Sequence, residues 1–180
     1  MLFPELSIGW NIAILILLGL AVVYILMLIM DIIFVLSFGA MIKRDNHGVR
    51  VALSTKLDIM KKFKEIFDEK KIKLTEETNH SIRYLDSEDF LEAQKEEFEI
   101  ARKELNAVES EIREVLKSEK KLSKMDEIQV LLTLLNDVNE SLRNSTIAYN
   151  ADILGYNYWV RFGPWRYIFL LFRIKLKKTI

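Results

Sequence analysis

The sequence contains no cysteine and only two prolines, Pro4 and Pro164, among its 180 residues. The absence of cysteine excludes a disulfide framework, a lipoprotein modification and any site built on thiolates. Because no proline stands between Pro4 and Pro164, nothing of that kind interrupts long helices in between. The two histidines, His47 and His80, cannot form a Cys-His pair or a zinc cluster without a thiolate partner.

The sequence has only weak signals for a metal site, a phosphate site or a nucleic-acid site. A di-metal carboxylate bundle uses Glu-x-x-His on facing helices, and the chain has this motif once, at Glu77 and His80. The six glycines form no phosphate-cradling loop. Dense mixed charge is typical of solvated helix faces, and a nucleic-acid groove has a different pattern. We therefore predict that the protein is not an enzyme, has no catalytic, cofactor-binding or metal residues, and binds no nucleic acid.

The N-terminal region is the most apolar part of the chain. Residues 12–30 contain no charge and no side-chain amide, and after Asp31 the apolar character resumes over residues 32–42. About 20 apolar residues in a helix cross a hydrocarbon core of ~30 Å. A helix also satisfies its own backbone hydrogen bonds inside lipid. We therefore predict a transmembrane helix over residues 8–30.

The same region indicates an anchor and an orientation. It is too long for a cleavable signal peptide, lacks a basic n-region, and has no clear small-x-small site before Lys43. Residues 1–11 carry one acid and no base, whereas Lys43, Arg44 and Arg50 follow the span. The positive-inside rule then predicts a single-pass protein with a short extracytoplasmic N-terminus, residues 1–7, and its main domain in the cytoplasm.

Asp31 has two interpretations, because burying a charge inside a bilayer costs a few kcal/mol. In the first, the span covers residues 8–30 and Asp31 lies at the cytoplasmic interface. In the second, the membrane is centred nearer residue 27 and Asp31 makes a polar contact between packed spans. The sequence is consistent with both interpretations of Asp31.

From residue 45 to residue 160, apolar residues recur at helical spacing. Breaks are expected at residues 45–48, at residues 79–87 with N-cap candidates Asp86 and Ser87, and at residues 118–123. Three helices of about thirty residues, with residues 32–42 as a fourth, would bury their apolar stripes in an antiparallel bundle over residues 31–160. The fold class is therefore all-α. The clearest seam has the coiled-coil 3-4-3-4-3 spacing and consists of Phe98, Ala101, Leu105, Val108, Ile112 and Val115.

The last predicted helix carries the most specific local pattern. Tyr149-Asn150 and Tyr156-Asn157 are seven residues apart, so the tyrosines share one helical face with the asparagines beside them. Tyrosines at this spacing are first of all core residues whose hydroxyls reach the rim. A binding site on this face is the alternative.

This pattern resembles the LemA family of bacterial membrane proteins, in which a paired Tyr-Asn helix of the same spacing leads into an aromatic-proline segment, here residues 162–164. Residues 49–66 and 122–142 are similar to two further family segments. The sequence matches a divergent member, because Lys61 replaces a family proline and no Tyr-Asn pair follows the span. The resemblance implies a four-helix bundle anchored in the bacterial inner membrane, and related proteins take part in membrane organisation. The family-motif residues are Tyr149, Asn150, Tyr156, Asn157 and Pro164.

The basic aromatic tail, residues 161–180, carries six basic residues and no acid. As a helix it would place basic side chains opposite aromatic and apolar ones, which is the composition of an interfacial element that binds anionic lipid. Each basic residue near an anionic surface contributes about 1 kcal/mol. Alternatively, the tail packs on the bundle or against residues 32–42. The predicted lipid-contact residues are Trp165, Arg166, Phe169, Phe172, Arg173, Lys175, Lys177 and Lys178.

Two function classes remain. The first is a membrane-anchored helical scaffold that self-associates as a homo-oligomer and organises or remodels the membrane, with its tail on anionic lipid. The second is a monomeric anchored adaptor that recruits a cytoplasmic or membrane-protein partner through charged helical faces, such as the Glu-rich residues 88–114. The regular heptads and the basic aromatic tail favour the scaffold.

Overall fold

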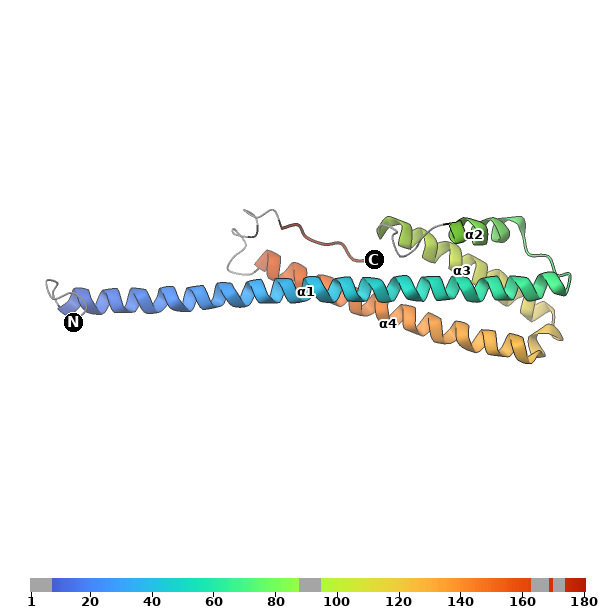
Figure 1. Ribbon diagram of the computed structural model, residues 1–180, viewed down its shortest axis with the longest axis horizontal. Helices are drawn as coiled ribbons and strands as arrows, with labels where there is room; N and C mark the ends of the chain where they lie inside the picture. Colours follow the sequence, from blue (N-terminus) through green and yellow to red (C-terminus); the bar gives the residue numbers. More distant parts are fainter. Residues whose placement is uncertain (1–7, 88–94, 163–168, 170–173) are drawn as a thin grey trace. The chain divides into compact units, whose positions relative to one another are not determined.

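The computed structural model describes residues 8–87, 95–162, 169 and 174–180. Within these residues the protein is mostly helical and has no strand, which confirms the all-α class for this part of the chain. The elements are α1 (Ile8–Glu69), α2 (Glu76–Ser87), α3 (Lys95–Ser118), the 3-10 helix η1 (Leu122–Lys124) and α4 (Asp126–Phe162) (Figure 1).

The chain divides into two compact units, each of which contains part of α1 and part of α4. Unit 1 consists of Met1–Met41 and Asp152–Thr179, and unit 2 consists of Ile42–Ala151 and Ile180.

Helix α1 has 62 residues, which corresponds to about 93 Å at the α-helical rise. Its first part is long and apolar enough to cross a membrane, by length and composition. No residue of that apolar window is buried. The exposed large apolar side chains from Ile8 to Leu36 have relative exposures of 37–69%.

The predicted turn at residues 45–48 is wrong, because α1 continues through it without a break. A glycine inside a helix costs about 1 kcal/mol relative to alanine, so Gly48 reads as a breaker in the sequence. In the structure it lies against α4, where a Cβ atom at Gly48 would be 3.3 Å from the Oγ atom of Ser145. The missing side chain therefore permits a close helix contact that local sequence does not reveal.

The predicted break at residues 79–87 is also wrong, because these residues belong to α2. Asp86 and Ser87 lie in the last turn of that helix. The chain instead leaves α1 after Glu69 and turns at Lys71, whose φ is 60°. Thr75 then caps α2, since its Oγ1 accepts a hydrogen bond of 3.2 Å from the Thr78 N–H. The break predicted at residues 118–123 is confirmed.

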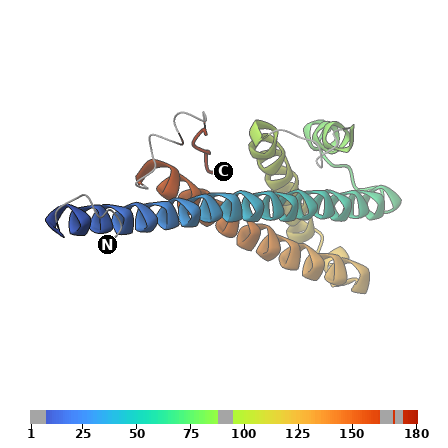
Figure 2. The same ribbon diagram turned by 60° about the vertical axis from the view of Figure 1, so that its left-hand side comes forward.

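One hydrophobic core stabilises unit 2. It combines apolar side chains from the second part of α1, from α2 and α3, and from the first part of α4. Figures 1 and 2 both show α2 beside α3. The predicted seam of α3 lies in this core, and only Val115 of its members is partly exposed. The seam residues with at most 4% exposure are Phe98, Ala101, Leu105, Val108 and Ile112.

Unit 1 has its own contact between α1 and α4. The rings of Phe34 and Trp159 stack with centroids 4.8 Å apart and an interplanar angle of 7°. One turn later in α1 and one turn earlier in α4, Phe38 lies against Gly155, where a Cβ atom would be 2.6 Å from a ring carbon. Gly155 therefore provides the space for the Phe38 ring.

Candidate functional site

The two tyrosines of the family motif are buried. Tyr149 and Tyr156 are each 7% exposed. Burial raises the pKa of both phenols, and for Tyr149 the nearby charge of Arg50 partly opposes the increase. Neither phenol is therefore suited to act as a base near neutral pH.

Asn157 binds the backbone of the chain's last described segment, residues 174–180, which we call the tail segment. Its Nδ2 donates to the carbonyl oxygen of Lys177 at 2.6 Å, and its Oδ1 accepts from the Lys177 N–H at 2.8 Å. Both partners belong to unit 1. A carboxamide can donate and accept at once, so it satisfies both backbone groups of one residue, as a neighbouring strand would.

Asn150 makes the same arrangement within unit 2. Its Nδ2 donates to the carbonyl oxygen of Ile180 at 2.7 Å, and its Oδ1 accepts from the Ile180 N–H at 2.9 Å. The two asparagines are two helical turns apart on α4, a rise of about 10.5 Å.

The burial pattern of the tail segment repeats every three residues. Ile174, Lys177 and Ile180 are half-buried, and the four residues between them are exposed. Every third residue of the segment is therefore partly covered by protein. The ammonium of Lys177 also lies 4.9 Å from the ring centroid of Tyr156, within cation–π range.

Ile180 also lines a cavity of about 310 Å³ in unit 2. Val49, Leu53 and Leu142 supply apolar lining, and Arg102 is one of its charged residues. The side chain of Ile180 packs against the hydrophobic core at the same place. Asn150 thus holds the backbone of the residue whose side chain contributes to this apolar cavity.

The tail segment shows where the predicted lipid-contact residues lie. It is not helical, so the helical arrangement expected for the tail does not apply to it. Lys175 and Lys178 are exposed, and Lys177 is half-buried. Phe169 is 3% exposed, so its side chain is covered by protein in this conformation. Five predicted residues lie outside the described part of the chain: Pro164, Trp165, Arg166, Phe172 and Arg173.

Asp31 is buried, with 5% exposure, in a helix whose neighbouring apolar side chains are exposed. Among the described residues, no group of three His, Cys, Asp or Glu side chains is placed to hold a metal ion.

Comparisons with protein-family models, with curated proteins and with solved structures give no match to this chain. The likeness to the LemA family therefore rests on the motif residues themselves. Of these, the structure places the two Tyr-Asn pairs on α4 with their tyrosines buried and their asparagines on the tail segment.

The role of the asparagines as backbone-binding residues was not predicted as such. The available signal was their repeat at the heptad distance beside two aromatic core residues. The segment that they bind is 20 residues away from Asn157 and 30 residues away from Asn150 in the sequence. Helical periodicity is a local pattern, so it does not reveal a contact of that separation.

Proposed function

We propose that this protein is a divergent LemA-like scaffold with a single membrane anchor. It self-associates and organises or remodels the bacterial inner membrane, and its tail contacts anionic lipid. In this proposal residues 8–30 span the membrane, the N-terminus lies outside, and the helical domain lies in the cytoplasm.

The exposed apolar part of α1 carries the proposal. A core helix of a soluble protein is mostly buried, whereas none of the apolar window of α1 is buried within the described residues. Leaving a large apolar side chain in water costs about 1.5–3 kcal/mol relative to burying it. A contiguous surface of this kind marks a contact with membrane or with protein. Its length matches a hydrocarbon core, which favours the membrane.

The order of the contacting residues along paired helices supports the proposed antiparallel bundle. In unit 1, Phe34 stacks on Trp159 while Phe38 lies on Gly155, and this order of contacts supports opposite directions for α1 and α4. In unit 2, a further pair of contacts gives the same relation between α3 and α4. These contacts are the Arg113–Asn136 hydrogen bond of 2.9 Å and the Glu109–Asn139 hydrogen bonds of 3.0 and 3.1 Å.

An apolar stripe on α4 supports self-association. Ile147 and Leu154 are seven residues apart on one face of the helix and are 56% and 63% exposed. Heptad-spaced apolar residues on an exposed face are typical of helices that pair with another helix. A second copy of the chain is a natural partner, because the same stripe is then available on both sides of the interface.

The mass of full-length protein in lipid nanodiscs tests self-association. We expect a defined oligomer for the native sequence and a smaller species for Leu154→Glu, because a charge in an apolar helix contact is costly. Val130→Glu is the matched control, since Val130 is 59% exposed on a different face of α4. A monomeric full-length protein would contradict the scaffold and favour the monomeric adaptor.

Amine-reactive footprinting tests the lipid contact. Lys175 and Lys178 are exposed in the structure, and a membrane of anionic lipid would protect them from acetylation. We expect slower modification of both residues in anionic nanodiscs than in neutral ones. Lys120 is the control, because it is exposed between α3 and η1 and should react equally in both. Equal rates for all three lysines would contradict the lipid contact.

A further inference from the structure

We propose that the cavity of unit 2 binds a single-chain amphiphile with a carboxylate head, of which a fatty acid is the simplest example. All residues that line the cavity belong to unit 2. Its volume is about 310 Å³. Sites for small molecules have volumes of about 300–1,000 Å³, so this cavity suits a ligand at the small end of that range. One acyl chain fits this size better than the two chains of a phospholipid.

The inner wall of the cavity is apolar and comes from three helices. It consists of Val49 and Leu53 of α1, Phe98 of α3 and Leu142 of α4, and these residues are 1–6% exposed. Ile180, which is half-buried, adds a fifth apolar side chain. An apolar cavity stays dry and takes up apolar molecules, because its wall atoms then gain contacts that an empty space cannot provide. The acyl chain of the ligand therefore lies against these side chains.

Helix α3 supplies a charged side to the same cavity. The lining residues of this side are exposed and recur at about one helical turn: Glu99, Arg102, Lys103 and Asn106. Within the described part of the chain, neither Arg102 nor Lys103 forms an ion pair. Two cations stand against one acid, so the potential on this side favours an anionic head. A head with one negative charge balances the excess of one positive charge.

Asn106 adds a hydrogen-bond donor beside these cations. Its Oδ1 accepts a hydrogen bond of 2.8 Å from the Nζ of Lys56. Because an ammonium can only donate, this bond fixes the orientation of the carboxamide and leaves its Nδ2 as a donor. Arg102, Lys103 and Asn106 therefore all offer N–H groups, and an ionised carboxylate is a group that only accepts. The buried apolar wall and the exposed donors together match the two ends of a fatty acid.

Protection of an introduced cysteine tests the site in full-length protein in nanodiscs, where no native cysteine reacts. Thr146→Cys places a thiol in the lining of the cavity. The Thr146 hydroxyl already donates to the Leu142 carbonyl oxygen at 2.7 Å, so the substitution removes no donor from the ligand. The rate of alkylation by a maleimide is measured against the concentration of octanoate, octanol or acetate. Lys120→Cys is the control, because Lys120 is exposed and does not line the cavity.

We expect octanoate to slow the alkylation of Thr146→Cys and to leave that of Lys120→Cys unchanged. Octanol has the chain without the charge and acetate has the charge without the chain, so each should protect only at higher concentration. Equal protection by octanoate and octanol would overturn the carboxylate site.

Charge variants in the Thr146→Cys chain test the head group. Arg102→Gln should weaken octanoate binding by about two- to fivefold, the range for an exposed charge pair, and should leave octanol binding unchanged. Glu99→Gln should strengthen octanoate binding, because it removes the acid from this side. Lys117→Gln is the matched control, since Lys117 is exposed on α3 and does not line the cavity. An octanoate affinity that is the same in all three variants would overturn the proposal.

The native sequence gives a second measurement that needs no cysteine. A ligand that binds only the folded state raises the melting temperature, so octanoate should raise it more than octanol does. Failure of octanoate both to protect the Thr146→Cys thiol and to raise the melting temperature would overturn the proposal. The site lies within one chain, so these results do not depend on whether the protein is the proposed scaffold or a monomeric adaptor.

Discussion

At the scale of single residues, unit 2 buries a charged group, the ammonium of Lys56, whose residue is 1% exposed in the core. It lies 2.7 Å from a carboxylate oxygen of Glu109 and donates to the Oδ1 of Asn106 at 2.8 Å. Glu109 in turn accepts from the Nε of Arg113 at 2.8 Å and from the amide of Asn139. This network joins α1, α3 and α4, and each buried charge in it depends on its partners.

Removing the Glu109 carboxylate should therefore lower the free energy of unfolding more than replacing Lys56 with an apolar residue does. We expect Glu109→Ala to lower the free energy of unfolding by about 3–5 kcal/mol, because it leaves a buried ammonium without its counter-charge. Lys56→Met should cost less, since Glu109 keeps Arg113 and Asn139. Chemical denaturation of full-length protein in detergent measures both values, and exposed Glu114→Ala is the control, with an expected change within about 0.5 kcal/mol. Equal costs for Glu109→Ala and Glu114→Ala would contradict the network.

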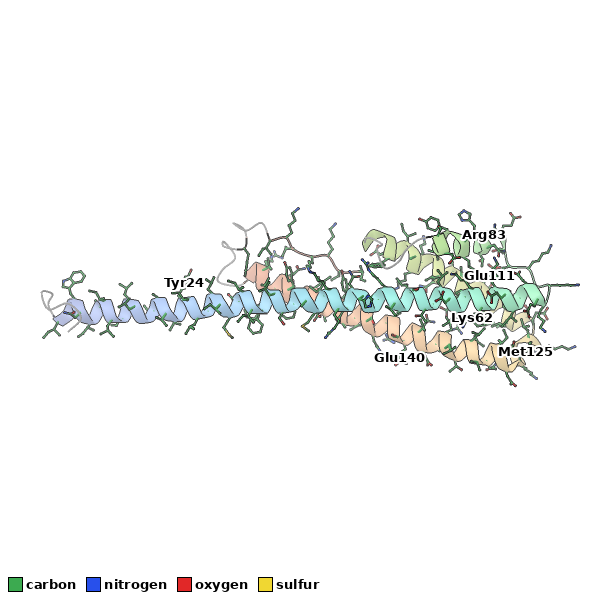
Figure 3. The ribbon with its side chains drawn as sticks, viewed as in Figure 1. Tyr24, Lys62, Arg83, Glu111, Met125 and Glu140 are labelled. Atoms are coloured by element: carbon green, nitrogen blue, oxygen red, sulfur yellow. The ribbon has the colours of Figure 1, made fainter. Side chains whose placement is uncertain are left out.

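Two carboxylates make the stability of unit 2 dependent on pH. Burial alone would raise the pKa of Glu109, but the Lys56 ammonium and the hydrogen bonds from Arg113 and Asn139 outweigh it and hold the pKa below 4.5. Burial opposes the shift of Glu111 too, and bonds from Thr78 and Thr75 again hold its pKa below 4.5. Glu111 lies against the start of α2, where it accepts from the Thr75 N–H at 2.7 Å (Figure 3).

The lowered pKa values of Glu109 and Glu111 determine how the stability changes with pH. A pKa that is lower in the folded state gives stability that is complete above the unfolded pKa of about 4.5 and is lost as the pH falls through the lower, folded value. We expect the melting temperature of the native protein to fall steeply below about pH 4.5. Glu111→Gln should start from a lower melting temperature at neutral pH and show a shallower decrease. Thermal melts followed by circular dichroism measure this, and parallel curves for the two proteins would contradict the role of Glu111.

At the scale of helices, the contact between α1 and α4 in unit 1 depends on one missing side chain. Glycine in a helix interior is ordinarily unfavourable by roughly 0.5–1 kcal/mol relative to alanine. At Gly155, however, an added Cβ would be 2.6 Å and 2.8 Å from two ring carbons of Phe38. Packing therefore outweighs helix propensity at this position.

Two alanine substitutions distinguish packing from propensity. We expect Gly155→Ala to lower the melting temperature, because the Phe38 ring must move away and its packing against α4 is lost. Gly39→Ala is the matched control on α1, since nothing lies within 4 Å of its added Cβ, and it should leave the melting temperature unchanged or raise it. Thermal melts of the two full-length variants in the same detergent measure whether packing or helix propensity dominates at Gly155. Stabilisation by both substitutions would show that the Gly155 contact is not important.

At the scale of the whole molecule, the charges around the apolar part of α1 predict one orientation in the membrane. Lys43, Arg44 and Arg50 follow the span, and the positive-inside rule places this side in the cytoplasm. Because the chain lacks cysteine, a single introduced cysteine reports its side without background labelling.

We expect Lys120→Cys to react with a membrane-impermeant maleimide only after the inner membrane is permeabilised. Ser7→Cys, on the other side of the predicted span, should react in intact spheroplasts. Labelling at Lys120→Cys in intact spheroplasts would reverse the proposed orientation. Labelling at both positions would contradict a single span.

The sequence by itself determined the features that depend on composition and on local periodicity. It predicted the apolar length of α1 from the absence of charge, and the buried seam of α3 from the 3-4-3-4-3 spacing. It also predicted the break before α4. These succeed because hydrophobic burial follows the helical period, and that period is visible within a few turns.

Only the tertiary structure decided the rest. Gly48 reads as a turn residue but packs inside α1 against Ser145, and α2 forms where a break was expected because Thr75 caps it and Glu111 of α3 binds its first turn. Asn150 and Asn157 bind backbone groups 30 and 20 residues away. Backbone N–H and C=O groups are present at every residue except proline, which has only the C=O. The sequence therefore does not indicate which of them a carboxamide will bind. That choice is made only when the helix and the tail segment come together in space.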